Sequence, residues 1–184
     1  MICRSLFTVI VLLGILYPSA ILAQDREIVH QFPKDYYGQW EGALQIFKGE
    51  EVVRTLPMML DIHPVSEGRD AWKIVYYVDR DSVVKDYELI TDDSIPGHYL
   101  IDEKNTILLD GYVHGGVFIQ QFEVSGSLLT VRVQRRGSFL EFEISAGPSM
   151  PIRKSGDTTF LEEKIPPVES FELNVRQFAV LNKK

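Results

Sequence analysis

Apolar and polar residues alternate along most of the chain after residue 38, and glycines interrupt the alternation at regular intervals. Successive side chains of a β-strand point to opposite faces, so a period of two predicts strands with one buried face. Gly115, Gly126 and Gly137 mark turns about every 8 to 12 residues, the spacing of consecutive hairpins. The sequence therefore predicts an all-β fold, an antiparallel up-and-down meander.

The N-terminal stretch has the features of a secretory signal peptide. Arg4 gives a positively charged n-region, an apolar run extends from Leu6 to Tyr17, and a cleavage site follows Ala23. A retained membrane anchor is the alternative, but the apolar run is shorter than the roughly 18 residues of a spanning helix, and Pro18 interrupts it. We therefore expect residues 1–23 to be a signal peptide and residues 24–184 to form one domain. That domain is expected to be periplasmic or secreted, with no transmembrane segment.

Cysteine content and charge exclude several classes of function. Cys3 is the only cysteine and lies in the predicted leader, so the mature chain has no disulfide, Cys metal site or Cys nucleophile. It also has no Asn-x-Ser/Thr glycosylation site, which favours a bacterial envelope over a eukaryotic secretory route. The net charge is -7, and loss of Arg4 would make it -8. An acidic domain without a basic cluster is a poor partner for nucleic acid.

Strand parity predicts which residues face the interior. Hairpin loop length fixes which residues oppose each other, so two-residue loops carry the inner face from strand to strand. We predict such loops at residues 80–81, 115–116, 126–127 and 136–137, which pair Val133 with Leu140 and Arg132 with Glu141. Glu123, Arg132 and Glu141 then point outward. The predicted inner face comprises Trp40, Gly42, Leu44, Ile46, Arg54, Leu56, Met58, Leu60, Ile62, Trp72, Ile74, Tyr76, Val78, Val83, Lys85, Tyr87, Leu89, Ile107, Leu109, Gly111, Val113, Phe118, Gln120, Phe122, Val124, Leu129, Val131, Val133, Leu140, Phe142 and Ile144.

Three polar side chains fall on this otherwise apolar face. Gln120 is expected opposite Gly111, which leaves both space and a hydrogen-bonding group inside the sheet. Lys85 is placed inside because the other parity would bury two carboxylates, which costs more. Arg54 and Lys85 both lie close to turns at the same end of an up-and-down sheet. The sequence therefore predicts that these two cations line one mouth.

The parity of residues 98–103 has two solutions. A three-residue loop before the next strand puts Tyr99 and Ile101 inside, whereas a two-residue loop puts His98, Leu100 and Asp102 there. Core faces prefer apolar residues, which favours Tyr99 and Ile101.

The alternation ends after Ser145, where prolines and polar residues predict a long loop or lid over residues 146–167. A last strand follows, from Phe171 to Ala179. This strand is expected to close the sheet against the first one.

The segment Gly38-Gln39-Trp40-Glu41-Gly42 resembles the opening of a calycin barrel. Lipocalins begin their first strand with Gly-x-Trp, and nitrobindin-like barrels begin with Gly-x-Trp-x-Gly. The resemblance implies a closed barrel of roughly 8 to 10 strands that holds one small, largely apolar ligand. It also implies that a basic residue of the last strand, here Arg176, packs on Trp40. The last strand has no histidine to serve as the axial ligand of a nitrobindin haem, and no cofactor is expected.

The residue pattern gives no catalytic centre. The four histidines, His30, His63, His98 and His114, are scattered, whereas a metal site needs ligands that converge on one point. Glu141 and Glu143 resemble a glycosidase pair, but they belong to a solvated outer face with Arg132 opposite. No serine lies in a nucleophile elbow. We therefore expect a protein that is not an enzyme.

The leading hypothesis is an exported barrel that binds a small hydrophobic or amphiphilic ligand. Two alternatives remain, an envelope interaction module with a solid core and a secreted glycan-binding or glycan-processing protein. Cavity volume separates the first two, and exposed aromatic residues or paired carboxylates in a cleft would favour the third. In the leading hypothesis an anionic head meets Arg54 and Lys85, and the predicted site residues are Arg54, Trp72, Tyr76, Lys85, Tyr87 and Gln120, with Phe122 beside them.

Overall fold

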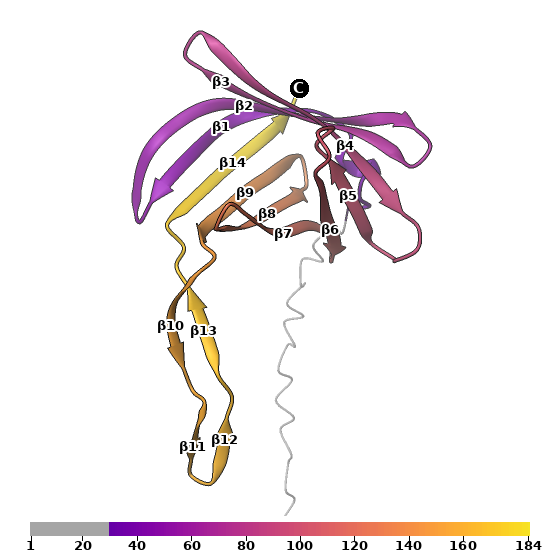
Figure 1. Cartoon of the computed structure of the whole chain (residues 1–184). Helices are drawn as coiled ribbons and strands as arrows, with labels where there is room; N and C mark the ends of the chain where they lie inside the picture. The colour runs from indigo at the N-terminus through magenta and orange to yellow at the C-terminus, as the bar shows by residue number, and fades with distance from the viewer. Residues whose placement is uncertain (1–29) are drawn as a thin grey trace, which may run out of the picture.

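Residues 30–184 are described in a computed structural model of the protein, shown in Figure 1. The predicted signal peptide, residues 1–23, lies outside the described residues. A short 3-10 helix (Lys34–Tyr36) precedes ten strands that form a closed barrel within the described range. The barrel strands are β1 (Gly38–Lys48), β2 (Glu51–Ser66), β3 (Arg69–Val78), β4 (Asp81–Asp92), β5 (His98–Asp102), β6 (Leu108–His114), β7 (Val117–Val124), β8 (Ser127–Arg136), β9 (Phe139–Pro148) and β14 (Val175–Lys183).

Each barrel strand from β1 to β9 pairs with the next one along the chain, always antiparallel. The last strand, β14, then enters between β9 and β1 and closes the cylinder. The predicted all-β, up-and-down meander and its closure by a C-terminal strand are therefore confirmed. Turns alternate between two ends of the barrel. We call the end with turns 67–68, 93–97, 115–116 and 137–138 the closed end, and the end with turns 49–50, 79–80, 103–107 and 125–126 the open end.

Only one of the four predicted two-residue loops has the predicted position, the one at residues 115–116, which sets Gly111 opposite Gln120. The other three lie one residue away, at residues 79–80, 125–126 and 137–138. A tight hairpin turn favours residues with positive φ at its centre. Ser125 and Gly126 meet this requirement together, with φ of 49° and 77°.

The displaced loops change strand partners but not faces. Val133 pairs with Phe142 instead of Leu140, and Arg132 pairs with Glu143 instead of Glu141. Moving a loop by one residue moves every partner by two, and side chains two apart share a face. The predicted assignment of side chains to the inner and outer faces of these strands is therefore correct. The fully buried core includes Trp40, Leu44, Met58, Leu60, Ile62, Leu89, Phe118, Val133, Leu140 and Phe142.

The parity left open for residues 98–103 is settled in favour of the apolar choice. Ile101 is buried and Tyr99 packs against the core. His98 is also buried, but on the outer face of the barrel, where its imidazole lies between the carboxylates of Asp92 and Asp110.

The closed end is filled by aromatic side chains. Phe32, from the segment before β1, stacks on Phe118 at 5.0 Å between ring centroids and contacts Tyr36 edge-on. Tyr99 and Trp72 pack against the same ring of Phe32. The chain before β1 therefore plugs this end of the barrel.

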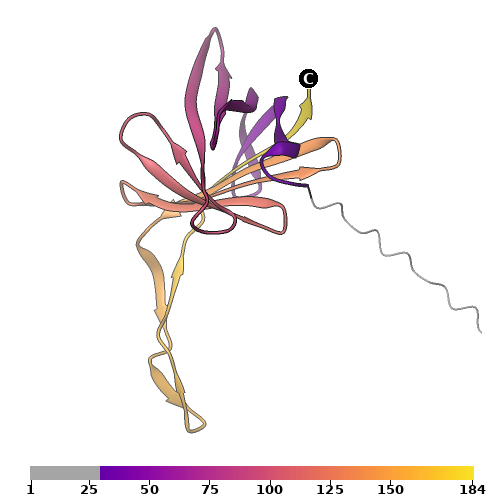
Figure 2. The same ribbon diagram turned by 90° about the vertical axis from the view of Figure 1, so that its right-hand side faces the viewer.

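The segment predicted as a loop or lid is instead a β-hairpin that projects from the open end, and Figures 1 and 2 show it extending away from the barrel in both views. We call residues 149–174 the arm. It is built of β10 (Pro151–Ser155) paired with β13 (Val168–Phe171), and of β11 (Thr158–Phe160) paired with β12 (Glu163–Ile165). Thr158, Thr159 and Phe160 suit strand pairing even though prolines and polar residues surround them.

Candidate ligand-binding site

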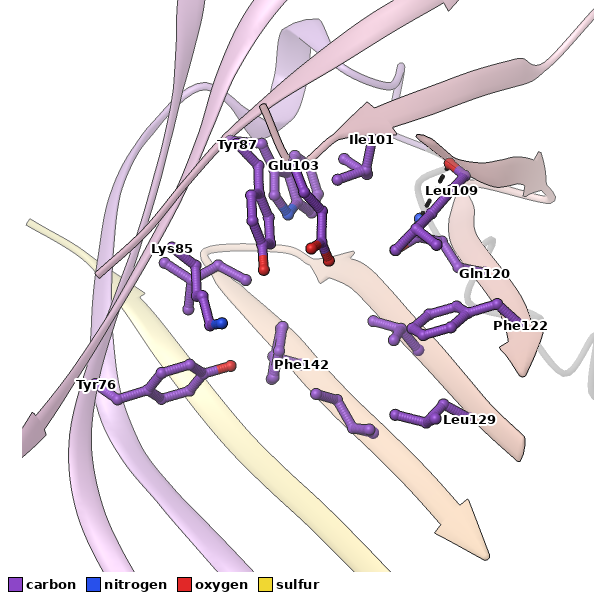
Figure 3. A pocket seen from close by; sticks show the side chains of 14 residues that line it. Tyr76, Lys85, Tyr87, Ile101, Glu103, Leu109, Gln120, Phe122, Leu129 and Phe142 are labelled. Carbon is purple, nitrogen blue, oxygen red and sulfur yellow. Dashed lines mark hydrogen bonds between the residues drawn. The ribbon is translucent and has the colours of Figure 1, made fainter. Parts of the chain in front are cut away.

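A cavity of about 290 Å³ occupies the barrel interior between the aromatic cluster and the open end. Figure 3 shows the side chains that point into it. The barrel is therefore filled at one end and hollow at the other, because Phe32, Tyr36, Tyr99 and Phe118 pack together at the closed end. The lining residues are Trp72, Ile74, Tyr76, Lys85, Tyr87, Ile101, Glu103, Leu109, Gln120, Phe122, Leu129, Val131, Phe142 and Ile144.

Trp72 forms part of the cavity floor. Its side chain is only 3% exposed, and its ring lies 5.3 Å from that of Phe118 in a tilted arrangement. The other tryptophan, Trp40, is fully buried in the closed-end core and does not line the cavity. The two tryptophans therefore have distinct environments.

Gln120 supplies a buried amide to one wall of the cavity. It is 5% exposed, and its Nε2 donates a long hydrogen bond of 3.5 Å to the carbonyl oxygen of Leu109. The facing residue, Gly111, has no side chain, and a Cβ there would lie 2.5 Å from the Phe118 ring. Glycine at position 111 thus lets Phe118 occupy the core beside Gln120.

Four polar side chains lie on the β3, β4 and β5 side of the cavity: Tyr76, Lys85, Tyr87 and Glu103. Burial raises the pKa of Tyr76 to about 12. Burial also raises the pKa of Tyr87 to about 12, with a further contribution from the nearby Glu103 carboxylate. Both phenols are consequently neutral at pH 7. Apolar residues of β7, β8 and β9 line the opposite wall.

Five of the six predicted site residues converge on this cavity: Trp72, Tyr76, Lys85, Tyr87 and Gln120. Their role in binding stays a prediction. Arg54 does not reach the cavity. It has the expected parity, but β2 pairs with β3 only from Met58 onward, so Arg54 lies exposed on a part of β2 that pairs with β1 alone.

Glu103 lines the cavity although it was not predicted to be a site residue. It follows β5 at the start of the five-residue turn 103–107, for which a loop of two or three residues was expected. Its backbone N–H donates to the carbonyl oxygen of Ile107 at 3.1 Å, and its Oε2 accepts from Nδ2 of Asn105 at 3.2 Å. The turn closes on itself through these bonds and aims the carboxylate inward. Glu103 has the same parity as the inward-facing Tyr99 and Ile101, and this parity was the sequence signal that could have identified it as a site residue.

A basic residue of the last strand does pack on Trp40, as the resemblance implied, but it is Lys183 and not Arg176. Arg176 lies at the open end, where it pairs with Glu143 and its guanidinium covers the ring of Phe178 at 4.6 Å. Trp40 is instead covered by Arg135 at 5.6 Å and by Lys183 at 5.3 Å. The choice of Arg176 was wrong because it stands near the beginning of β14, whereas the Trp40 end of β1 pairs with the end of β14.

Among residues 30–184, no group of three or more His, Cys, Asp or Glu residues has the geometry of a metal site. Within the same range, no helix combines the length and the apolar character needed to cross a membrane.

Comparison with known proteins gives a likeness in structure and none in sequence. No family model matches the chain, and no curated protein matches it in sequence. Among solved structures it is similar to the S-type phycobiliprotein lyase CPES from Guillardia theta, with a TM-score of 0.53 and 7% sequence identity. The match covers 80% of this chain and 88% of that one. Together with the closed antiparallel barrel, this likeness supports a calycin-like fold.

Proposed function

We propose that the protein is an exported, non-enzymatic barrel that binds one small amphiphilic ligand in its interior. The cavity of about 290 Å³ carries this proposal, because it combines an apolar wall with a few convergent polar groups. The non-enzymatic part rests on the sequence, which contains no recognisable catalytic motif. Export rests on the signal-like N-terminal stretch.

The likeness to a phycobiliprotein lyase supports the barrel architecture alone. At 7% identity, the likeness gives no basis for assigning the activity named for that protein to this chain. The proposal therefore depends on the cavity and its own side chains.

The exposed apolar surface of the arm favours a second role for the protein, in binding another macromolecule. Two-stranded hairpins are marginally stable in water by themselves, and a concentration of exposed apolar side chains marks a contact surface. Seven large apolar side chains of the arm are exposed: Met150, Ile152, Phe160, Leu161, Val168, Phe171 and Leu173.

Ligand titrations, together with a substitution that fills the cavity, test the proposed function. We expect octanol and octanoate to bind the wild-type protein in calorimetric titrations, and to shift the fluorescence of Trp72 in a Trp40→Phe variant. Val131→Phe, on the cavity wall, should abolish binding because its ring occupies the ligand volume. Thr130→Phe is the matched control, since Thr130 is adjacent on β8 but lies on the outer face. Absence of binding to the wild type, or equal binding to the Val131→Phe variant, would refute interior binding.

A further inference from the structure

Two opposite charges face the cavity without neutralising each other. Lys85 comes from β4 and Glu103 from the turn after β5, and both side chains line the same space. We propose that the ligand is a short amphiphile whose polar end carries both an anionic acceptor and a hydrogen-bond donor, as a zwitterion does. This inference rests on the proposed function and specifies the chemistry of that same site.

One part of the polar side offers hydrogen-bond donors. Among the described residues, the Lys85 ammonium forms no ion pair or hydrogen bond, and the Tyr76 hydroxyl forms no hydrogen bond. Figure 3 shows both groups directed into the cavity. A lysine carries three donors and no acceptor, and a neutral phenol has a proton to donate. These two side chains therefore suit a carboxylate or another anionic acceptor.

The other part offers acceptors. The Tyr87 hydroxyl and the Glu103 carboxylate face the same part of the cavity. A carboxylate has about four acceptor positions, and the bond from Asn105 leaves most of them open. Glu103 also has no cationic partner among the described residues. A ligand ammonium would supply both a hydrogen-bond donor and a positive charge, whereas a ligand amide or hydroxyl would supply the donor alone.

A ligand with only one of these features would bind less well. When a ligand displaces water from the cavity, a charged group left without a partner loses the hydration that this water supplied, and the loss is not compensated. The loss is partial for Lys85, which is exposed, and larger for the half-buried Glu103. A simple fatty acid satisfies Lys85 and leaves Glu103 unmatched. A simple amine does the reverse. A head that carries both groups pairs with both side chains at once.

Cavity volume limits the size of this ligand. At about 30 Å³ for each small non-hydrogen group, the share that a water molecule takes in the liquid, 290 Å³ holds on the order of ten non-hydrogen atoms. This volume lies at the lower limit of ordinary ligand pockets. The site therefore suits a short chain or a single ring instead of a long lipid.

Four probes with the same short chain separate the contributions of the head: octanol, octanoate, octylamine and 2-aminooctanoate. We expect 2-aminooctanoate to bind the full protein about tenfold more tightly than octanoate or octylamine at pH 7, measured by calorimetry. Lys85→Met should weaken octanoate and 2-aminooctanoate about tenfold and leave octanol unchanged. Glu103→Gln should weaken octylamine and 2-aminooctanoate and leave octanoate no weaker.

Lys73→Met and Asp81→Asn are matched controls, because both side chains lie outside the cavity lining, and they should change no affinity. If octanol binds but 2-aminooctanoate binds no more tightly than octanoate, the inferred head group is wrong while the proposed function stands. If none of the four probes binds the wild type, both are wrong. If Lys85→Met and Lys73→Met weaken octanoate equally, the effect is nonspecific and the assignment of Lys85 fails.

Discussion

Tyr36 is the residue at which three distant segments meet. Its hydroxyl donates to the carbonyl oxygen of Gly116 and accepts from the backbone N–H of Arg135 at 2.9 Å, while its own carbonyl oxygen accepts from Nε1 of Trp40 at 2.8 Å. The Arg135 guanidinium, which covers Trp40, also donates to the carbonyl oxygen of Asp35. The short helix before β1 is thereby fixed to β8 and to the turn between β6 and β7.

Tyr36→Phe should lower the free energy of unfolding by about 1–3 kcal/mol, because it leaves two backbone polar groups at a buried position without a partner. Chemical denaturation at pH 7 measures this change. Tyr112→Phe is the control, since that side chain is 40% exposed, and it should stay within about 0.5 kcal/mol of the wild type. Equal effects of the two substitutions would mean that the Tyr36 hydroxyl does not contribute as described.

His98 makes stability depend on pH. Its Nδ1 lies 2.8 Å from Asp92 Oδ2 and its Nε2 lies 2.8 Å from Asp110 Oδ1, and its ring stacks on Tyr112. Hydrogen bonds to Asp110 and then Asp92 raise the pKa of His98. Hydrogen bonds from Ser94 and then His98 lower the pKa of Asp92 to about 2, so this carboxylate remains ionised at the pH values that matter for the histidine.

A histidine whose folded-state pKa is raised adds stability that is fully present below the unfolded pKa, about 6.5, and is lost as pH rises through the folded pKa. The difference in unfolding free energy between the wild type and His98→Phe should therefore be largest between about pH 5 and 6.5 and should shrink toward alkaline pH. An NMR titration of the His98 ring gives the midpoint directly. A midpoint at or below about 6.5 would contradict the two carboxylate contacts.

At the scale of elements, the arm and the barrel are separate in their strand pairing. β10 pairs only with β13 and β11 only with β12, whereas all barrel strands pair among themselves. Replacing residues 150–172 with an Asn-Gly turn should therefore leave the barrel folded. We expect the midpoint of thermal unfolding to move by less than about 4 °C, which corresponds to about 1 kcal/mol for a chain of this size.

The arm-deleted protein should also bind octanoate with unchanged affinity, because no residue of the arm lines the cavity. Calorimetry on the two proteins side by side measures this. Loss of binding by a folded, arm-deleted barrel would show that the arm contributes to the site.

Strand parity explains why the barrel wall could be predicted from sequence. The inner face followed from side-chain alternation, and it tolerated three misplaced turns because each error moved the partner by two residues. Parity could not predict the surroundings of a residue when these depend on where the neighbouring strand ends. Arg54 has the correct parity, yet β3 does not accompany β2 that far. The arm was missed because its strands are short and interrupted by proline and glycine.

At the scale of the whole molecule, the balance between solid and hollow interior could not be predicted from the sequence. Phe32, Tyr36 and Tyr99 fill the closed end together with Trp72 and Phe118, and this requires the segment before β1 to fold back into the barrel. No alternating pattern indicates such a plug. The same distribution of aromatic side chains leaves Glu103, Lys85 and their neighbours around empty space at the other end.

Closure of the barrel by its first and last strands has a consequence for folding kinetics. Trp40 pairs with Lys183 and Phe47 pairs with Arg176, so the contacts that complete the cylinder join residues more than a hundred positions apart. Such long-range pairing raises the contact order, and all-β domains of this kind fold in milliseconds to seconds, not in microseconds. Until β14 arrives, β1 and β9 each present an unpaired strand edge, which is a template for aggregation. The chain is therefore most vulnerable to self-association in the interval before its last nine-residue strand is in place.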